Sequence, residues 1–338
     1  MKPAETILLD HGSGGRASQE LIKNIFLAQL DNPVLACLED SALVETGAGR
    51  LAFTTDSYVV DPIFFPGGDI GELAINGTIN DLAMRGAKPL CLSLGLILEE
   101  GFPLADLQRV IASVRTACSR ADVPVVTGDT KVVPRGKGDK IFINTSGIGL
   151  VDPGIDISSR HAGPGDMIIL SGSMGDHGIT ILTQRAGISL QGNLRSDTMA
   201  LHRLVQKMLA AAPGAVHTLR DPTRGGVATS LNEIAAAAQV AVELDENQLP
   251  IKPEVGAACE ILGMDPLYLA NEGKCLALVA AEHADRLLAL MRSLPEGADA
   301  AIIGRVTKGP AGRVRLNTAA GGSRIVQSLT GEPLPRIC

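Results

Sequence analysis

Apolar residues change their spacing within the first half of the chain, and this change is the strongest constraint on the fold. Leucines occupy every second position in residues 90–98, which is the period of a β-strand. In residues 104–118 the apolar positions follow a spacing of three and four, which is typical of a helix. Further patterns predict strands at 123–133 and 140–151 and a helix at 70–85. The fold class is therefore α/β (α+β), with mixed sheets and helices.

A stretch rich in Gly, Pro and Asp near residues 152–165 divides the chain into two halves of similar plan. The 338 residues are long for one core and sufficient for two α/β domains. The last eight residues, GEPLPRIC, contain two prolines and are expected to form an extended tail. Helices in the second half are expected near 176–186, 197–211, 225–238, 253–262 and 282–293. The predicted segments are 1–38, a glycine-rich stretch and helix; 39–152 and 160–310, the two domains; and 311–338, which ends in a flexible tail.

The composition argues against several functional classes. A net charge of −7 without any Lys/Arg block disfavours a nucleic-acid partner, and 2% aromatic residues leave few stacking surfaces. No apolar stretch approaches the roughly 20 residues of a membrane span, so no membrane association is expected. The N-terminus lacks a signal-peptide pattern, and the six cysteines form no CxxC pair. We therefore expect a cytoplasmic protein.

Four aspartates at turns or strand ends are candidate metal ligands: Asp40, Asp56, Asp81 and Asp129. A magnesium ion on a nucleotide takes one or two carboxylates together with phosphate oxygens. Aspartate is also common in turns, which explains each residue when it is taken alone. Asp56 and Asp129 are the stronger candidates, because each interrupts an apolar strand where a charge needs a partner. Lys131 shares a strand face with Asp129, and it fits a phosphate-neutralising role or a surface ion pair equally well.

Two glycine-rich segments, at residues 11–16 and 221–227, each precede a predicted helix. Free backbone N–H groups at such a position can bind phosphate. The first segment is not a Walker sequence, because no Lys-Ser/Thr pair follows it. In the second, Arg224 could hold phosphate oxygens, although an Asp-Pro turn that caps a helix would look the same. We favour phosphate binding because one chain carries both segments.

Two single residues are candidates for the chemistry. Glu272 lies between two apolar runs that are expected to be strands, so it is either paired or has a raised pKa that would suit a general base. A solvated hairpin tip explains the same residues, and the spacing alone slightly favours it. Cys338 is the last residue, and chain ends are usually exposed and mobile, so its thiol would be available for reaction. An incidental terminal cysteine is about as good an explanation without further context.

Taken together, the motifs resemble one family over almost the whole chain. They stand in the family's order and comprise HGSGGR, TTDSYVV, GTINDLAMRGAKP, VTGDTKVV, RDPTRGG, ANEGK and a terminal PRIC. The family is HypE, the ATP-dependent carbamoyl dehydratase of NiFe-hydrogenase maturation, within the PurM-like superfamily of aminoimidazole ribonucleotide synthetase. The terminal Pro-Arg-Ile-Cys distinguishes this family from the rest of the superfamily.

The resemblance implies a two-domain PurM-like fold with an extended C-terminal tail. Residues 39–152 would be the N-terminal domain, which takes part in ATP binding and in forming a homodimer, and residues 160–310 the C-terminal domain. The implied reaction uses ATP and Mg²⁺ to dehydrate a thiocarbamate on the terminal cysteine to a thiocyanate. The carbamoyltransferase HypF would load this cysteine, and the HypC–HypD complex would receive the cyano group for the hydrogenase iron.

The resemblance also implies roles for individual residues. Cys338 matches the carrier thiol, and Lys131 and Glu272 match residues that the family uses in chemistry. Asp40 is a weaker match than the other metal positions, because superfamily members often have Asp-Asp where this chain has Glu39-Asp40. The positions that match the metal site are Asp40, Asp56, Asp81 and Asp129. The positions that match nucleotide or phosphate contacts are Gly12, Ser13, Gly14, Gly15, Thr130, Asp221, Thr223, Arg224, Gly225 and Gly226.

Two alternatives stay open from the sequence. A different PurM-like enzyme is one of them, but selenophosphate synthetase is expected to carry a Cys or selenocysteine in the N-terminal glycine segment, which has none here. Thiamine-phosphate kinase gives no reason for a terminal cysteine. The other alternative is a non-enzymatic scaffold for hydrogenase assembly, which predicts no ATP turnover and no need for Lys131 or Glu272.

Overall fold

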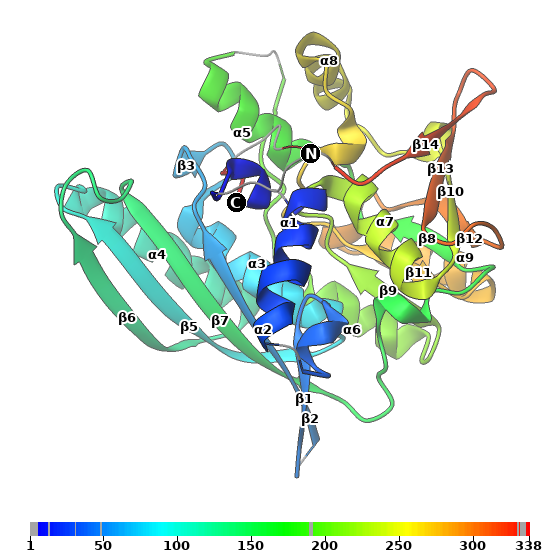
Figure 1. The fold of residues 1–338 in the computed structure, drawn as a ribbon, viewed down its shortest axis with the longest axis horizontal. Helices are drawn as coiled ribbons and strands as arrows, with labels where there is room; N and C mark the ends of the chain where they lie inside the picture. Colours follow the sequence, from blue (N-terminus) through cyan, green and yellow to red (C-terminus); the bar gives the residue numbers. More distant parts are fainter. Residues whose placement is uncertain are drawn as a thin grey trace.

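Two mixed β-sheets, each with helices packed against it, form the framework of the protein (Figure 1). The computed structural model describes residues 6–12, 14–30, 32–47, 49–188, 192–329, 331 and 336–338. The fold class predicted from the alternation of strand and helix patterns is confirmed.

The first sheet lies in the N-terminal half and is covered on one face by two helices. Its strands, in spatial order, are β1 (Ala42–Thr46), β2 (Gly49–Tyr58), β7 (Ile141–Val151), β5 (Lys88–Glu99) and β6 (Val125–Val133). The covering helices are α3 (Ile70–Met84) and α4 (Leu104–Ala121). Asp69 caps α3 by accepting hydrogen bonds from the N–H groups of Gly71 and Glu72. Gly77 on α3 is required by close packing, because a Cβ there would lie 2.3 Å from the Tyr58 hydroxyl oxygen.

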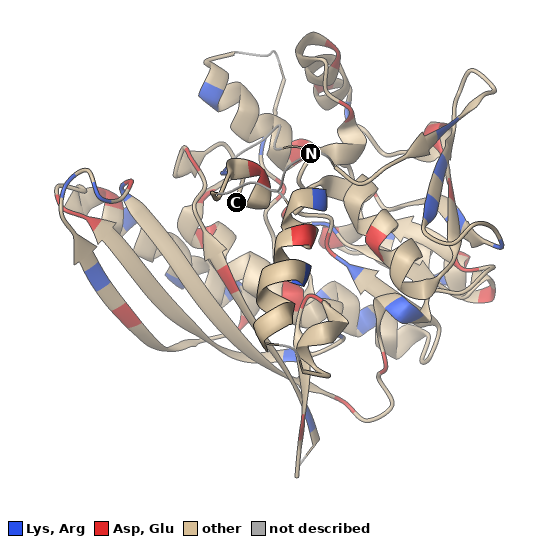
Figure 2. Ribbon diagram, viewed as in Figure 1, with Lys and Arg blue, Asp and Glu red and all other residues tan. Residues whose placement is uncertain are grey.

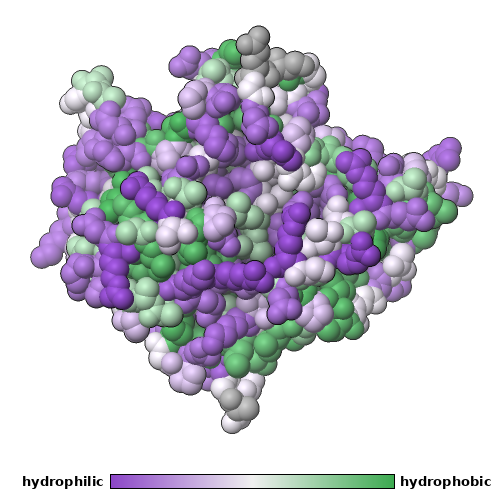
Figure 3. All heavy atoms as spheres, turned by 180° about the vertical axis from the view of Figure 1, so that it is seen from behind, coloured by the Kyte–Doolittle hydropathy of each residue, from purple (hydrophilic) through white to green (hydrophobic). Residues whose placement is uncertain are grey.

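The opposite face of the first sheet carries exposed apolar side chains. Phe53, Ile97, Ile148 and Leu150 point to this open face. Strands β5 and β7 show almost no charged residues, whereas β6 shows one of each sign (Figure 2). Seen from behind, on the side away from the open face, apolar residues also lie along the margin of the molecule where the edge strand β6 is found (Figure 3). A monomer rarely leaves an apolar sheet face uncovered, so the open face is suited to contact with another protein surface.

The second sheet is buried on both faces at its strand β11 (Leu276–Val279). In this strand, Leu276 and Leu278 pack in the core beside α7 (Gly226–Ala238), whereas Ala277 and Val279 pack in the core beside α6 (His202–Ala211) and α9 (Ala281–Arg292). Its strands, in spatial order, are β14 (Ser323–Val326), β13 (Arg313–Asn317), β10 (Ala241–Asp245), β12 (Ala301–Thr307), β8 (Met167–Leu170), β11 (Leu276–Val279) and β9 (Val216–Arg220). The three helices are α6 (His202–Ala211), α7 (Gly226–Ala238) and α9 (Ala281–Arg292). Layers on both sides explain why β11 is apolar at every position.

Shorter elements complete the fold. The other α and β elements are α1 (Arg16–Leu21), α2 (Ala28–Leu30), α5 (Asp176–Ala186), α8 (Pro253–Leu262), β3 (Phe64–Phe65) and β4 (Gly68–Asp69). The π-helix η2 (Ile22–Leu27) joins α1 to α2. The 3₁₀ turns are η1 (Leu9–Gly12), η3 (Leu35–Cys37), η4 (Ser159–His161), η5 (Glu246–Gln248), η6 (Pro266–Tyr268) and η7 (Pro295–Gly297). Within the described ranges no helix combines the length and apolar character needed to cross a membrane.

Two local predictions in the second half are wrong. The helix predicted at 197–211 begins only at His202, because the preceding residues cross α3 without regular secondary structure. There Asn80 donates to the Met199 carbonyl oxygen at 3.0 Å and accepts from the Leu201 N–H at 2.8 Å. The apolar run before Glu272 is the 3₁₀ turn η6 and not a strand. The domain boundaries 39–152 and 160–310 stay predictions.

Candidate active site

A polar pocket of about 210 Å³ lies where the two halves of the chain meet. We call it the central pocket. Strand β2 and helix α3 form one wall, and the segment after β9 together with the loop before β11 forms the other. The lining residues are Asp40, Thr54, Thr55, Asp56, Gly77, Asp81, Arg220, Asp221, Thr223, Arg224, Glu272 and Cys338. Three of the four predicted metal ligands, Asp40, Asp56 and Asp81, therefore line one pocket. The predicted phosphate contacts Asp221, Thr223 and Arg224 line the same pocket.

The central pocket concentrates acidic side chains. Burial raises the pKa of Asp40 and of Asp81 well above the usual value, and their acidic neighbours add to the effect. Burial also raises the pKa of Asp221 to about 6. Asp40 forms an ion pair with Arg220, with 3.0 Å between Nε and Oδ1, and Asp81 accepts a hydrogen bond of 2.7 Å from Thr54. A wall with this excess of carboxylates favours a bound cation.

The acidic wall is not a complete metal site by itself. Among the residues that the structure describes, no three His, Cys, Asp or Glu side chains come together in a group that could hold a metal ion. Asp40, Asp56 and Asp81 nevertheless face the same pocket. Carboxylates spread in this way fit a magnesium ion that takes its remaining ligands from phosphate oxygens and water.

Asp129, Thr130 and Lys131 lie outside the central pocket. Asp129 and Lys131 stand on the edge strand β6, with side chains 69% exposed, and form an ion pair of 2.7 Å. The hydrogen bond from Lys131 lowers the pKa of Asp129. Asp129 pairs in register with Gly95, which pairs with Asn144 and through it with Ser57. Asp129 and Lys131 therefore face the open side of the sheet, whereas the neighbouring Asp56 faces the central pocket.

The two glycine-rich segments come together in space. Gly14 packs against Arg224, because a Cβ on Gly14 would lie 2.9 Å from the Arg224 Cβ. The N–H of Arg16 donates to the Leu329 carbonyl oxygen, and Gln19 donates to Glu233 on α7. Gly225 and Gly226 both have positive φ and turn the chain into α7. Gly12 and Gly15 belong to the same N-terminal stretch without lining the pocket, and the predicted contact from Ser13 lies outside the described residues.

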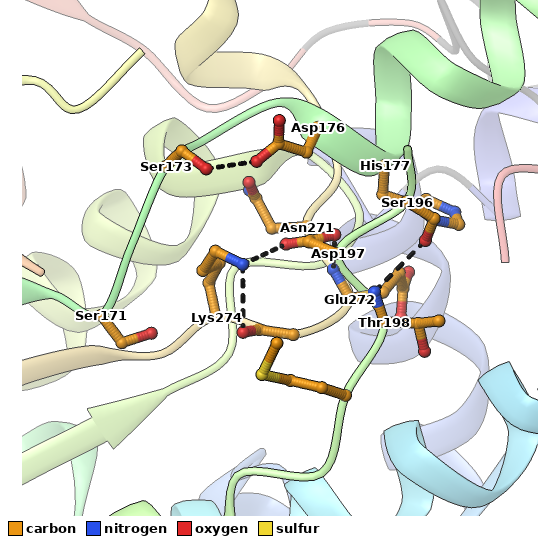
Figure 4. Close-up of polar contacts among 12 residues, drawn as sticks. Ser171, Ser173, Asp176, His177, Ser196, Asp197, Thr198, Asn271, Glu272 and Lys274 are labelled. Atoms are coloured by element: carbon orange, nitrogen blue, oxygen red, sulfur yellow. Dashed lines mark hydrogen bonds and ion pairs between the residues drawn. The ribbon is translucent and has the colours of Figure 1, made fainter. Parts of the chain in front are cut away.

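Glu272 is buried beside the pocket and is not a solvated hairpin tip. Its side chain is 3% exposed, and the described residues provide no hydrogen bond to Oε1. Burial raises the pKa of Glu272 well above 4.5, and the charge of Asp197 raises it further. Asp197 accepts a hydrogen bond from the Glu272 N–H at 3.1 Å and forms an ion pair with Lys274 (Figure 4). A carboxyl group with a raised pKa is a stronger proton acceptor once it is ionised, as a general base requires.

The C-terminus is docked in the central pocket, and the prediction of an exposed end is wrong for its last residues. Cys338 is 6% exposed, and its Sγ accepts a hydrogen bond of 3.0 Å from Nη1 of Arg224. Burial raises the pKa of the thiol to about 12, although Arg224 opposes this shift. The N–H of Val59 donates to the Cys338 carbonyl oxygen at 2.9 Å, and the N–H of Asp61 donates to that of Arg336. These backbone bonds extend the end of β2 and guide the thiol inward.

Several residues of the site were missed in the sequence. Arg220 binds both Asp40 and Glu233, and it could have been found because it directly precedes the Asp-Pro turn. Asp197 accepts a hydrogen bond from the Glu272 N–H, and His177 binds the carbonyl oxygen of Ile337 in the tail. Both residues come from separate segments with no local pattern that points to the site.

Comparisons with known proteins agree with this geometry. Residues 38–151 match the N-terminal domain of AIR synthase related protein, and residues 163–317 match its C-terminal domain. The chain is 54% identical to carbamoyl dehydratase HypE of Azotobacter vinelandii over 328 residues, which cover 97% of this chain and 96% of that protein. 

Two solved structures show the same fold. A HypE in complex with ATP has a TM-score of 0.83 and 51% identity, with 98% of this chain and 100% of that chain covered. The HypE of a HypE–HypF complex has a TM-score of 0.87 and 44% identity, with 91% and 99% covered. This similarity along the whole length disfavours the other PurM-like enzymes and the scaffold. The chain belongs to the HypE family of carbamoyl dehydratases.

Proposed function

We propose that this protein uses ATP to dehydrate a carboxamide carried on its own Cys338, giving a thiocyanate whose cyano group becomes a ligand of the NiFe-hydrogenase iron. The observation that supports this most directly is the hydrogen bond between Cys338 Sγ and Arg224 inside the acidic central pocket. A terminal thiol has no structural reason to be buried among carboxylates and a guanidinium, because desolvation of these groups is costly. A reaction at the sulfur gives that reason.

The reaction needs two events at the group on the sulfur. The carboxamide oxygen attacks the γ-phosphorus of ATP, ADP leaves, and the nitrogen gives up one proton. The second N–H proton then departs as the C–O bond breaks, so that C≡N forms and phosphate leaves. The net change is the loss of one water from the carboxamide, with its oxygen retained in the phosphate.

The residues of the pocket divide this work between them. Glu272 is the base for the nitrogen protons, because its raised pKa makes the ionised carboxylate a strong acceptor. Arg224 holds the sulfur and can also stabilise phosphate oxygens. The buried walls exclude water, which would otherwise intercept the phosphorylated intermediate.

ATP and Mg²⁺ are the proposed cofactors. A relative at 51% identity is described in complex with ATP, which supports nucleotide binding here. Asp40, Asp56 and Asp81 would hold Mg²⁺, which would neutralise the phosphate charge during transfer. The turn around Gly225 at the start of α7 would bind phosphate, whereas the N–H groups of Gly14 and Gly226 already donate to the Ser18 hydroxyl and to the Thr223 carbonyl oxygen.

The open face of the first sheet supports a homodimer. Asp129 and Lys131 stand on this face and can act on a nucleotide only if a second copy covers it, whereas the side chain of Thr130 points to the opposite face of the strand. We therefore assign Asp129 and Lys131 to a site shared between two chains, in which they meet the partner's phosphates. A second candidate role is a surface ion pair, which their exposure would also explain.

Partner proteins complete the proposal. A relative at 44% identity is described in a complex with HypF, and we propose that HypF loads carbamoyl onto Cys338. The loaded thiol must leave the pocket to reach HypF and later the HypC–HypD complex, so docking has to be reversible. The proposed location is the cytoplasm.

Mass spectrometry of one peptide tests the function. Cleavage before aspartate releases residues 299–338, in which Cys338 is the only cysteine. After incubation with HypF, carbamoyl phosphate and ATP, this peptide should carry one carbamoyl group, and turnover by the protein with ATP and Mg²⁺ should remove one water from it. An adduct on any other peptide, or an adduct that never loses water, contradicts the proposal.

A further inference from the structure

The docked tail is held by a buried histidine as well as by backbone pairing. His177, on the first turn of α5, is 0% exposed, and its Nε2 lies 2.7 Å from the Ile337 carbonyl oxygen. A carbonyl oxygen only accepts, so Nε2 carries the proton of this hydrogen bond. Ile337 is the residue next to Cys338, so the bond fixes the backbone immediately before the thiol.

The environment of His177 selects this tautomer. Nδ1 lies 2.8 Å from the Ser196 hydroxyl, which must donate because Nδ1 of a neutral ring with a protonated Nε2 is an acceptor. The same hydroxyl oxygen accepts a hydrogen bond from the N–H of Thr198. The imidazole and the ring of Phe65 form a T-shaped contact, with 5.5 Å between the ring centroids. Both the position and the protonation of the imidazole are therefore specified.

The residues beside Ser196 reach the other side of the site. Asp197 accepts a hydrogen bond from the Glu272 N–H and forms an ion pair of 3.1 Å with Lys274 (Figure 4). Thr198 accepts a hydrogen bond from Asn76 of α3. Figure 4 shows Ser196 turned to His177 and Asp197 turned to Lys274 and Glu272. We call these three consecutive residues the 196–198 segment. Ser196 contacts His177, Asp197 contacts the loop that carries Glu272, and Thr198 contacts the N-terminal half of the chain.

The 196–198 segment has little room to shift. The Ser196 N–H donates to the Pro66 carbonyl oxygen at 2.8 Å, and a Cβ on Gly67 would lie 2.7 Å from the Ser196 carbonyl oxygen. A Cβ on Gly273 would lie 1.8 Å from the Asp197 carbonyl oxygen, so that position accepts only glycine without rearrangement. The segment is packed between both halves of the chain.

We propose that His177 is a positioning residue that holds the tail in its reactive place through Ile337, and that the 196–198 segment sets this histidine and the Glu272 loop together. The claim that this position of the tail is needed for dehydration rests on the proposed function, whereas the claim that His177 holds the tail does not. The hydrogen bond is made to the backbone one residue before the sulfur, so it is independent of the group that the sulfur carries. His177 can hold the free thiol, the thiocarboxamide and the thiocyanate in the same register.

Alkylation of Cys338 measures the docking directly. A buried thiol reacts with iodoacetamide only after it leaves the pocket, so the rate reports the undocked fraction. We compare the wild type with His177→Leu, which removes the hydrogen bond, and with His177→Gln, whose amide can donate from a similar position. Modification is followed on the peptide 299–338, where other cysteines do not interfere. We expect His177→Leu to react on the order of tenfold faster, the effect of one lost hydrogen bond, and His177→Gln to return towards the wild-type rate.

Two further variants keep this test sharp. His202→Leu also removes a partly buried imidazole, but one that lies beside Ala121 and Asp122 at the end of α4 and whose Nδ1 has no hydrogen-bond partner in the described structure, so the rate should not change. Ser196→Ala keeps the ring and removes its partner, so it should react faster than the wild type if His177→Leu fails to fold. Equal rates for the wild type, His177→Leu and Ser196→Ala overturn the proposal.

Single-turnover dehydration separates this inference from the function. With Cys338 preloaded, His177→Leu should dehydrate on the order of tenfold more slowly than the wild type, while loading by HypF is not slowed. If alkylation accelerates but dehydration keeps its rate, the positioning role is wrong and the function stands. If the wild type itself never dehydrates, the function is wrong, and the alkylation rates still decide whether His177 holds the tail.

Discussion

The guanidinium of Arg224 donates a hydrogen bond to the thiol of Cys338 across 3.0 Å, although the two residues are 114 positions apart in the chain. This contact joins the glycine-rich turn before α7 to the extreme C-terminus. It places the thiol opposite the acidic wall of β2 and α3. The relationship makes the docked tail sensitive to the charge state of the sulfur.

Docking of the tail should weaken at alkaline pH. Burial raises the thiol pKa from 9.0 to about 12, so the docked state prefers the neutral thiol. The preference for the neutral thiol stabilises the docked state fully below pH 9, and this stabilisation is lost as the pH rises from 9 towards 12. Methyl NMR of Ile337 should show its resonance moving towards the position of an exposed isoleucine over this range.

The matched control is Cys338→Ser, whose hydroxyl does not ionise in this range. Its Ile337 resonance should stay in the docked position at the same pH values. A parallel loss of docking in the serine variant would show that titration of the thiol is not the cause.

Glu272→Gln should slow dehydration while leaving the loading of Cys338 intact. A positioned base contributes about 10²–10⁴-fold to rate, and glutamine cannot accept the nitrogen proton. In the wild type the single-turnover rate should rise with pH through a midpoint above 4.5, because burial raises the pKa of the carboxyl group. Quenched-flow mass spectrometry of the peptide 299–338 measures both effects.

Glu272→Gln should also stabilise the folded protein, and more so at high pH than at low pH. A carboxyl whose pKa is raised by folding stabilises the protein at low pH and costs stability as the pH rises. Glu272→Gln should therefore raise Tm more at pH 8 than at pH 5. An equal shift at both values would mean that Glu272 is ionised without penalty in the folded protein.

Arg220→Met should destabilise the protein by about 3 kcal/mol, because it leaves the buried Asp40 without its cation. Asp40 can escape the penalty by taking up a proton, so the loss measured by urea unfolding should shrink between pH 8 and pH 5. Arg305→Met, at an exposed ion pair with Glu243, is the control and should cost less than about 1 kcal/mol. A loss of the same size for both variants would contradict the role of burial.

Mixed dimers test the assignment of Lys131. Lys131→Met and Cys338→Ala should each be inactive alone, because one lacks a phosphate partner and the other lacks the thiol. Coexpressed with different affinity tags, they should form mixed dimers that regain dehydration, since the open face directs Lys131 to the partner's site. Inactive mixed dimers contradict the shared site, and full activity of Lys131→Met alone supports the surface ion pair.

Regular elements could be predicted from the sequence where one periodicity dominates. The alternation of leucines in β5 and the helical spacing in α4 survive in the structure because each element buries one side against a neighbour. The start of α6 was predicted too early, because Asn80 binds the backbone of Met199 and Leu201 and the helix begins only after them. Such a tertiary contact leaves no trace in local spacing.

The candidate site divides in the same way. Asp40, Asp56 and Asp81 could be selected as acids at turns and strand ends, and the fold brings them to one pocket. Asp129 fits the same pattern, but the register of β6 turns it to the opposite face, and register depends on strand pairing across the sheet. Cys338 was expected to be exposed, as chain ends usually are. Its burial could not be predicted, because the contacts that hold the tail come from Val59, His177 and Arg224, which lie far from it in the sequence.

A crystal structure of the S-carbamoylated protein with a non-hydrolysable ATP analogue and Mg²⁺ tests the central claim most directly. The account predicts the carboxamide in the central pocket, with its nitrogen within hydrogen-bond distance of Glu272 and its oxygen facing the terminal phosphate. A loaded Cys338 that lies outside the pocket while the nucleotide is bound would contradict it.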